Sequence, residues 1–159
     1  MIEKGEIVEH KKFNFRYWIS SIVFFAGIVF TVWAAGGNFW NFIDVPSFLI
    51  IGILPFLFTS ILFGFKETGL AFSIRSIQYP DKESLKKAAC FFEMYGKITF
   101  ISGIMSVIIG IFIMLVNLDD PTALGPNLAW TLIPIFYCCI IYAIIIVPFS
   151  VFIKNRLNE

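Results

Sequence analysis

The chain has 159 residues, of which 58% are hydrophobic and 14% charged, and its formal net charge is +1. Together with a mean hydropathy of +0.86, this composition excludes an ordinary soluble domain. We therefore expect an integral membrane protein that contacts lipid and has no nucleic-acid partner.

Four apolar runs have no interior charged residue, and each is near or above the roughly 18 residues that an apolar helix needs to cross a bilayer. They cover approximately residues 17–35, 46–65, 98–116 and 128–153. These runs lack the polar stripes that helices of a soluble bundle show. The sequence predicts a single all-α domain with four transmembrane helices, flanked by the segments 1–16, 66–97 and 154–159.

The basic residues predict the orientation of the spans. All 12 Lys and Arg residues lie in the three segments outside the spans, namely 1–16, 66–97 and 154–159. Because cytoplasmic loops of membrane proteins are enriched in Lys and Arg, we expect these segments and both termini to be cytoplasmic. The two short loops hold only Asp44, Asp119 and Asp120 as charged residues, so they are expected to face outward.

Asp44 and Pro46 mark the expected start of the second helix, since aspartate caps free N–H groups and proline suits a first turn. Pro55 falls in the middle of this span and is expected to kink it. The spacing of apolar residues beyond Phe65 predicts that the helix continues into the cytoplasm as far as Pro80.

The segment after Pro80 should form a helix that leads into the third span. Asp81 is its expected N-cap, and Glu83 lies in its first turn. One face of this helix is predicted to hold Leu85, Ala88, Ala89, Phe92 and Tyr95.

Turn-forming residues fill the decapeptide 117–126, which reads NLDDPTALGP. Pro121 fixes its own φ and disfavours helix at Asp120, and the two aspartates can bond neighbouring amides. Gly125 and Pro126 are a second pair of turn-forming residues in this segment. The sequence thus predicts a polar outward loop, followed by the fourth helix from Leu128.

Small and hydroxyl-bearing residues recur on one face of each of the last two spans. Such a face either lets two helices approach closely or lines a hydrated path, and the sequence leaves both interpretations open. The residues are Ser102, Gly103, Ser106 and Gly110 in the third span, and Thr131, Ile135, Cys138 and Tyr142 in the fourth.

No motif for catalysis or metal binding occurs in the sequence. Cys90, Cys138 and Cys139 lack the spacing of metal ligands, and the single histidine, His10, lies in a charged terminal segment. No nucleophile–base pair or phosphate-binding loop is present. We therefore expect no enzyme activity, no metal and no cofactor.

Two segments resemble a known family. The loop 117–126, with Asp119, Asp120, Pro121, Gly125 and Pro126, is similar to the loop between the third and fourth helices of the MotA/PomA flagellar stator proteins. These belong to the MotA/TolQ/ExbB superfamily. The segment FIDVPS at 42–47, with Asp44, Pro46 and Ser47, resembles the first periplasmic loop of that family.

The resemblance covers roughly residues 18–65 and 96–153, and within the fourth helix Tyr137 and Pro148 match family residues. It implies a ring, most simply a homo-pentamer, in the bacterial inner membrane around a MotB/TolR/ExbD-like single-span protein. It also implies a subunit of an ion-driven motor or stator complex. The large cytoplasmic insert of the stator proteins is missing from this chain.

Ion-conducting family members carry threonines at positions that align with Val107 and Ile135. The resemblance therefore implies that conduction would need a shifted path, for which Ser102, Ser106 and Thr131 are the candidates. No span holds Asp, Glu, Lys, Arg or His, so the partner would have to supply the membrane aspartate. The alternative is a stator-like membrane scaffold or assembly protein that conducts no ions.

The orientation gives the first testable prediction. In a variant with the native cysteines replaced, Asn38→Cys and Thr122→Cys should react with an impermeant thiol reagent added to intact cells. Ser84→Cys should react only after the cells are opened, because the basic segments lie inside. Labelling of Ser84→Cys in intact cells would contradict the orientation.

Overall fold

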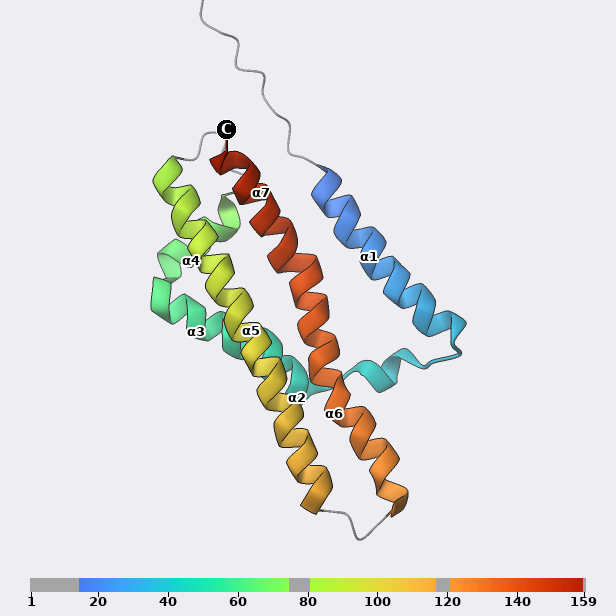
Figure 1. The fold of residues 1–159 in the computed structure, drawn as a ribbon. Coiled ribbons are helices and arrows are strands. Elements are labelled where there is room, and N and C mark those ends of the chain that lie inside the picture. Colours follow the sequence, from blue (N-terminus) through green and yellow to red (C-terminus); the bar gives the residue numbers. More distant parts are fainter. Residues whose placement is uncertain (1–14, 75–80, 117–120, 159) are drawn as a thin grey trace, which may run out of the picture.

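The computed structural model describes residues 15–74, 81–116 and 121–158 (Figure 1). These residues are 92% helical, and no strand occurs among them. The first half contains α1 (Phe15–Ala34), the 3-10 helix η1 (Phe39–Phe42), α2 (Val45–Phe48), the π-helix η2 (Leu49–Ile53), α3 (Leu54–Phe63) and α4 (Phe65–Ser73). The second half contains α5 (Lys82–Val116), α6 (Pro121–Ile141), the π-helix η3 (Tyr142–Ile146) and α7 (Val147–Leu157).

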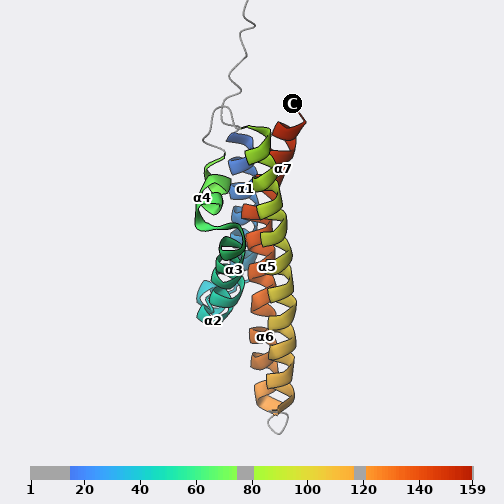
Figure 2. The same ribbon diagram turned by 90° about the vertical axis from the view of Figure 1, so that its left-hand side faces the viewer.

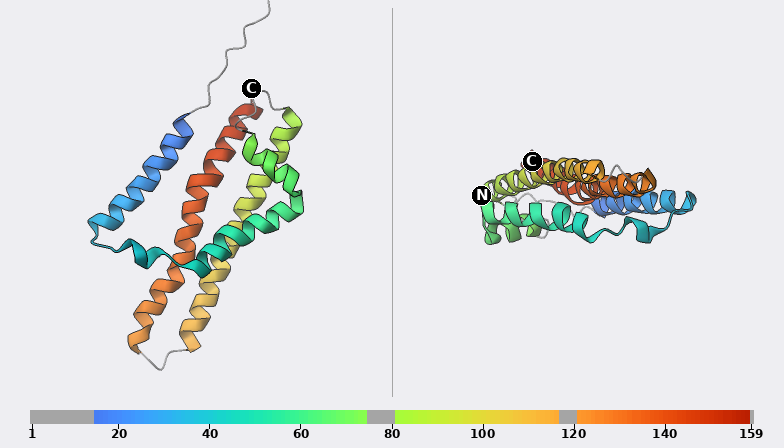
Figure 3. Two further views of the ribbon diagram at one scale, coloured as in Figure 1. Left: turned by 180° about the vertical axis from the view of Figure 1, so that it is seen from behind. Right: turned by 90° about the horizontal axis from the view of Figure 1, so that it is seen from below.

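The long helix α5 and the continuous run α6–η3–α7 form an antiparallel pair. The other helices pack against this pair. Helices α1 to α4 lie along one side of this pair and form a second layer (Figures 2 and 3). The far ends of α5 and α6 extend past α2 and η1 (Figure 1), and these two helices pack against each other.

Three helical segments are long and apolar enough to cross a membrane: Val45–Phe63, Lys82–Val116 and Thr122–Leu157. They correspond to the second, third and fourth expected spans, and they confirm the all-α class. The apolar part of α1 that can be assessed, Ile19–Ala34, is shorter than a span. A fourth span therefore stays a prediction.

Both predicted helix caps are present. The Ser47 N–H donates to Asp44 Oδ2 at 2.9 Å, and the Ser84 N–H donates to Asp81 Oδ2 at 3.1 Å. Hydrogen bonds from the Ser84 side chain and backbone hold the pKa of the Asp81 carboxyl below its ordinary value. The predicted face of α5 is confirmed as well, with Leu85, Ala88, Phe92 and Tyr95 buried and Ala89 half-buried.

The prediction that the second helix continues to Pro80 is wrong. Helix α3 ends at Phe63, and Gly64 has φ +86° and ψ 143°, a conformation that almost only glycine adopts. Residues 75–80 lie outside the described residues. A π turn, η2, ends two residues before Pro55, and the Leu54 N–H donates to the Leu49 carbonyl. The expected kink at Pro55 stays a prediction.

The expected start of the fourth helix at Leu128 is also wrong, since α6 begins at Pro121. Gly125 and Pro126 therefore lie inside the helix rather than in a loop. A proline this close to the N-terminus removes only one intrahelical bond, so the two turn formers do not stop the helix. Asp119 and Asp120 lie outside the described residues.

The hydrophobic core sits where α4, the first half of α5 and α7 meet, at the expected cytoplasmic end. Phe72 of α4 is half-buried and packs against this core, with its ring centroid 5.2 Å from that of Phe92 and 5.5 Å from that of Phe149. Aromatic contacts of this kind add to the stabilisation from buried area. The buried members of this core are Ala71, Ile74, Leu85, Ala88, Phe91, Phe92, Tyr95, Ile146, Phe152 and Ile153.

The break at Gly64 gives a second prediction. Gly64→Ala should lower stability by about 1–3 kcal/mol, because an alanine is strained at this positive φ. The matched control is Gly69→Ala in α4, where an added Cβ meets nothing within 4 Å and helix propensity favours alanine. Thermal unfolding in detergent measures the stability of both variants. Equal melting temperatures would contradict the strain that we expect at the positive φ of residue 64.

Candidate functional site

Helices α5 and α6–η3 pack closely through three glycines of α5 that recur every seven residues. A heptad repeat keeps one face of a helix against its antiparallel neighbour. The facing side chains on the partner helix also recur. The contacts are Gly96 with Tyr142 and Ile146, Gly103 with Cys138, and Gly110 with Thr131.

The approach is closest at Gly110. A Cβ built on this glycine would lie 2.7 Å from Thr131 Oγ1 and 2.8 Å from Thr131 Cγ2. A Cβ on Gly103 would lie 3.3 Å from the Cβ and Sγ atoms of Cys138. The Cys138 thiol also reaches the Thr99 carbonyl, at 3.6 Å. The small-residue faces predicted from the sequence thus form a helix contact within one chain.

Two of the three predicted pathway residues lie at this contact. Ser106 is 7% exposed and stands one turn before Gly110, and Thr131 is 5% exposed. The Thr131 hydroxyl donates to the Asn127 carbonyl at 2.8 Å. The Ser106 hydroxyl has no hydrogen-bond partner among the described residues. Ser102, one turn before Ser106, is half-buried.

The two positions that the resemblance aligns with threonines of ion-conducting stator proteins have different surroundings. Ile135 is 43% exposed and Val107 is half-buried. Thr131, by contrast, is turned into the contact with α5. Thr131 therefore does not occupy the surroundings of Ile135, and a path along these hydroxyls would run between α5 and α6.

Tyr137 of α6 holds the first of the two segments that resemble the stator family, 42–47. Its hydroxyl donates to the Phe42 carbonyl at 2.6 Å and accepts from the Asp44 N–H at 3.1 Å. Its ring meets Phe48 edge-on, with centroids 6.5 Å apart. Pro46 lies in the first turn of α2, and Ser47 beside it is buried. The first loop is thereby fixed to α6.

Pro148 belongs to a second such junction. Without an N–H it cannot bond the carbonyl four residues earlier, which is that of Ile144. The Ser21 hydroxyl of α1 donates to this Ile144 carbonyl at 3.4 Å. The π-helix η3 ends two residues before Pro148, as η2 ends two residues before Pro55.

Sequence reasoning missed several buried hydroxyls. Thr59, Ser60 and Thr99 are each 0% exposed. Thr59 donates to the Pro55 carbonyl at 2.8 Å, whereas the Ser60 hydroxyl has no partner among the described residues. The Thr99 hydroxyl makes no hydrogen bond of good geometry, although Tyr95 interacts with it from the preceding turn. Thr99 lies seven residues before Ser106, a spacing that could have identified it.

In the part of the chain that the structure describes, no three His, Cys, Asp or Glu side chains gather as metal ligands.

Compared with known proteins, the chain matches no protein-family model and no curated protein. The resemblance to the stator proteins therefore stays a prediction.

The contact at Gly110 gives a third prediction. Gly110→Ala should cost about 1–3 kcal/mol, because its Cβ forces α5 away from Thr131. Gly125→Ala in α6 is the matched control, since an added Cβ meets nothing there within 4 Å. Adding Thr131→Ala to Gly110→Ala should restore part of the loss, because the two closest atoms are removed. Thermal unfolding of the wild type, Gly110→Ala, Thr131→Ala, the double variant and the Gly125→Ala control tests this. Additive effects of the pair would refute direct contact.

Proposed function

We propose that the chain is a MotA-like subunit of an ion-driven membrane motor or stator complex. In this proposal several copies, most simply five, form a ring in the bacterial inner membrane with both termini in the cytoplasm. A MotB/TolR/ExbD-like single-span protein occupies the centre. The three long apolar helices and the resemblance of 42–47 and 117–126 to stator loops support the proposal.

The observation that carries the proposal is the unpaired hydroxyl of Ser106. A buried polar group without a partner costs about 1–3 kcal/mol, and more where hydrocarbon replaces water. Such a group favours an additional partner, which could be a water molecule, an ion or another chain. Gly110, one turn after Ser106, packs against Thr131, so both hydroxyls belong to the contact between α5 and α6.

A central partner is needed because this chain supplies no proton carrier of its own within these helices. The runs 98–116 and 128–153 contain no Asp, Glu, Lys, Arg or His. Titratable residues within the membrane normally mark the paths of protons and ions. The proposal therefore assigns the titratable aspartate to the single-span partner and the hydroxyl groups to this chain.

The second candidate function is a stator-like scaffold that conducts no ions. It is favoured by the closure of the α5–α6 contact, in which Thr131 already donates to the Asn127 carbonyl. The exposed side chain at the matched family position is the hydrocarbon of Ile135. A scaffold would keep the ring and the partner without a path for ions.

The fourth prediction separates the two functions. In vesicles that hold the ring and its candidate partner, Thr131→Val and Ser106→Ala should sharply reduce proton or sodium uptake. The hydroxyls they remove would otherwise interact with the permeating ion or its water, at about 1–3 kcal/mol each. Thr59→Val is the matched control, because Thr59 is equally buried and makes the same bond to the carbonyl four residues earlier at 2.8 Å.

Three results of this experiment distinguish an ion path, a scaffold and the absence of a ring. Native mass spectrometry of the same preparation must show the ring with the partner bound, and a protein that remains monomeric in mild detergent would contradict the ring. Uptake unchanged in Thr131→Val and Ser106→Ala would exclude the path between α5 and α6. No uptake by an intact ring with its partner would favour the scaffold, for which a hydroxyl in a packed helix face contributes only about 0.6 kcal/mol.

A further inference from the structure

Pro134 interrupts the backbone hydrogen bonds of α6 where this helix faces α5. Each carbonyl of an α-helix accepts from the N–H four residues later, and proline has no N–H to donate. The Trp130 carbonyl therefore lacks its helical partner. Because Pro134 is buried, this carbonyl lies on the side of α6 that faces the protein.

The Ser106 hydroxyl lies opposite this break. The two glycine contacts of α5 with Cys138 and Thr131 set the register of the antiparallel helices. Ser106 stands three residues after one of these glycines and four before the other, and Pro134 stands three residues after Thr131 and four before Cys138. Ser106 and Pro134 therefore lie at one level of the contact, where Ser106 is only 7% exposed.

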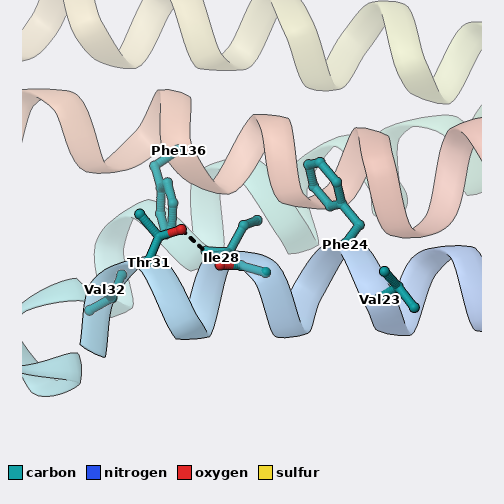
Figure 4. A pocket seen from close by; sticks show the side chains of 7 residues that line it. Val23, Phe24, Ile28, Thr31, Val32 and Phe136 are labelled. Carbon is teal, nitrogen blue, oxygen red and sulfur yellow. Dashed lines mark hydrogen bonds between the residues drawn. The ribbon is translucent and has the colours of Figure 1, made fainter. Parts of the chain in front are cut away.

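The Ser106 hydroxyl is not used by its own helix. Helical Ser and Thr side chains often donate to the carbonyl four residues earlier. The Thr31 hydroxyl donates in this way to the Gly27 carbonyl at 2.9 Å (Figure 4), and the Thr131 hydroxyl donates to the Asn127 carbonyl at 2.8 Å. The buried Ser106 hydroxyl makes no hydrogen bond to any described residue, so it is available for a partner between the helices.

The break at Pro148 shows how this fold satisfies such a carbonyl. There the hydroxyl of Ser21, from a neighbouring helix, donates to the Ile144 carbonyl at 3.4 Å. At Pro134 the Ser106 hydroxyl makes no direct bond of this kind. Ordered waters bridge buried polar groups that do not meet directly, and in hydrocarbon they satisfy backbone groups that proline has freed.

We propose that one water molecule is bound between α5 and α6, where it accepts from the Ser106 hydroxyl and donates to the Trp130 carbonyl. The water satisfies two buried groups at once, one from each helix. It belongs to the single chain and requires neither a ring nor ion transport. Its absence would therefore leave the proposed function to be decided by the uptake experiment.

Solid-state NMR of the full chain in lipid bilayers tests for this water. Thr131 is the only threonine that follows a tryptophan, and Thr99 is the only one that follows an isoleucine. Labelling Trp and Ile carbonyls with ¹³C and Thr with ¹⁵N therefore isolates the carbonyls of Trp130 and Ile98. The measured quantity is the transfer of proton polarisation from water to the Trp130 carbonyl, relative to the transfer to Ile98.

This ratio should fall in Ser106→Ala, because the water loses its donor. It should also fall in Pro134→Ala, in which the new N–H can bond the Trp130 carbonyl. Ser60→Ala is the matched control, since the Ser60 hydroxyl of α3 is also buried without a partner among the described residues, and it should leave the ratio unchanged. A ratio that is the same in the wild type and Ser106→Ala would overturn the proposal.

Thermal unfolding tests the link between hydroxyl and carbonyl by a second route. Removing a hydroxyl that is truly unpaired would raise the melting temperature, whereas removing one that holds a needed water should lower it. Ser106→Ala should therefore lower the melting temperature, and by less in the Pro134→Ala background. Ser60→Ala should cause the same shift in both backgrounds. A higher melting temperature in Ser106→Ala, or an equal decrease in both backgrounds, would contradict the bridge.

Discussion

The need to satisfy backbone hydrogen bonds without water constrains the whole fold, since a helix in hydrocarbon must pair its own N–H and C=O groups. Pro55 and Pro148 each remove a donor, and in both places a π turn ends two residues before the proline. At Pro148 a second helix helps, because the Ser21 hydroxyl donates to the Ile144 carbonyl. The hydrogen bond that satisfies the Ile144 carbonyl thus also attaches α1 to η3. Past Ser21, α1 diverges from α6 (Figure 1).

The glycine repeat of α5 determines where polar side chains can lie. Without a Cβ at Gly110, the Thr131 side chain can pack directly against the α5 backbone, and Ser106 is buried in the same contact. The close packing of α5 against α6 therefore also buries the two hydroxyl groups. An ion path along these hydroxyls requires α5 and α6 to separate or to admit water, whereas a scaffold requires neither.

Local sequence signals predicted the helices, the caps at Asp44 and Asp81 and the small-residue faces, because each depends on residues within one or two turns. They failed at Gly64, where the apolar periodicity continues although the backbone has φ +86°. They also failed at Pro126, whose cost depends on its distance from a helix start that the sequence did not reveal. The bonds of Tyr137 to Phe42 and Asp44 join residues more than 90 positions apart, so no local pattern could predict them.

The two ends of the molecule differ in how they are stabilised. The core around Phe72, Phe92 and Phe149 joins α4, α5 and α7 at one end, whereas at the other end α5 and α6 extend beyond α2 and α3 (Figure 2). Phe112 and Val116, near the end of α5, are exposed. Lipid gives no hydrophobic drive between helices, so such side chains cost little when they are unpartnered in a bilayer. Folding can therefore depend on the compact end, while the outer half of α5 remains available for contacts with other chains.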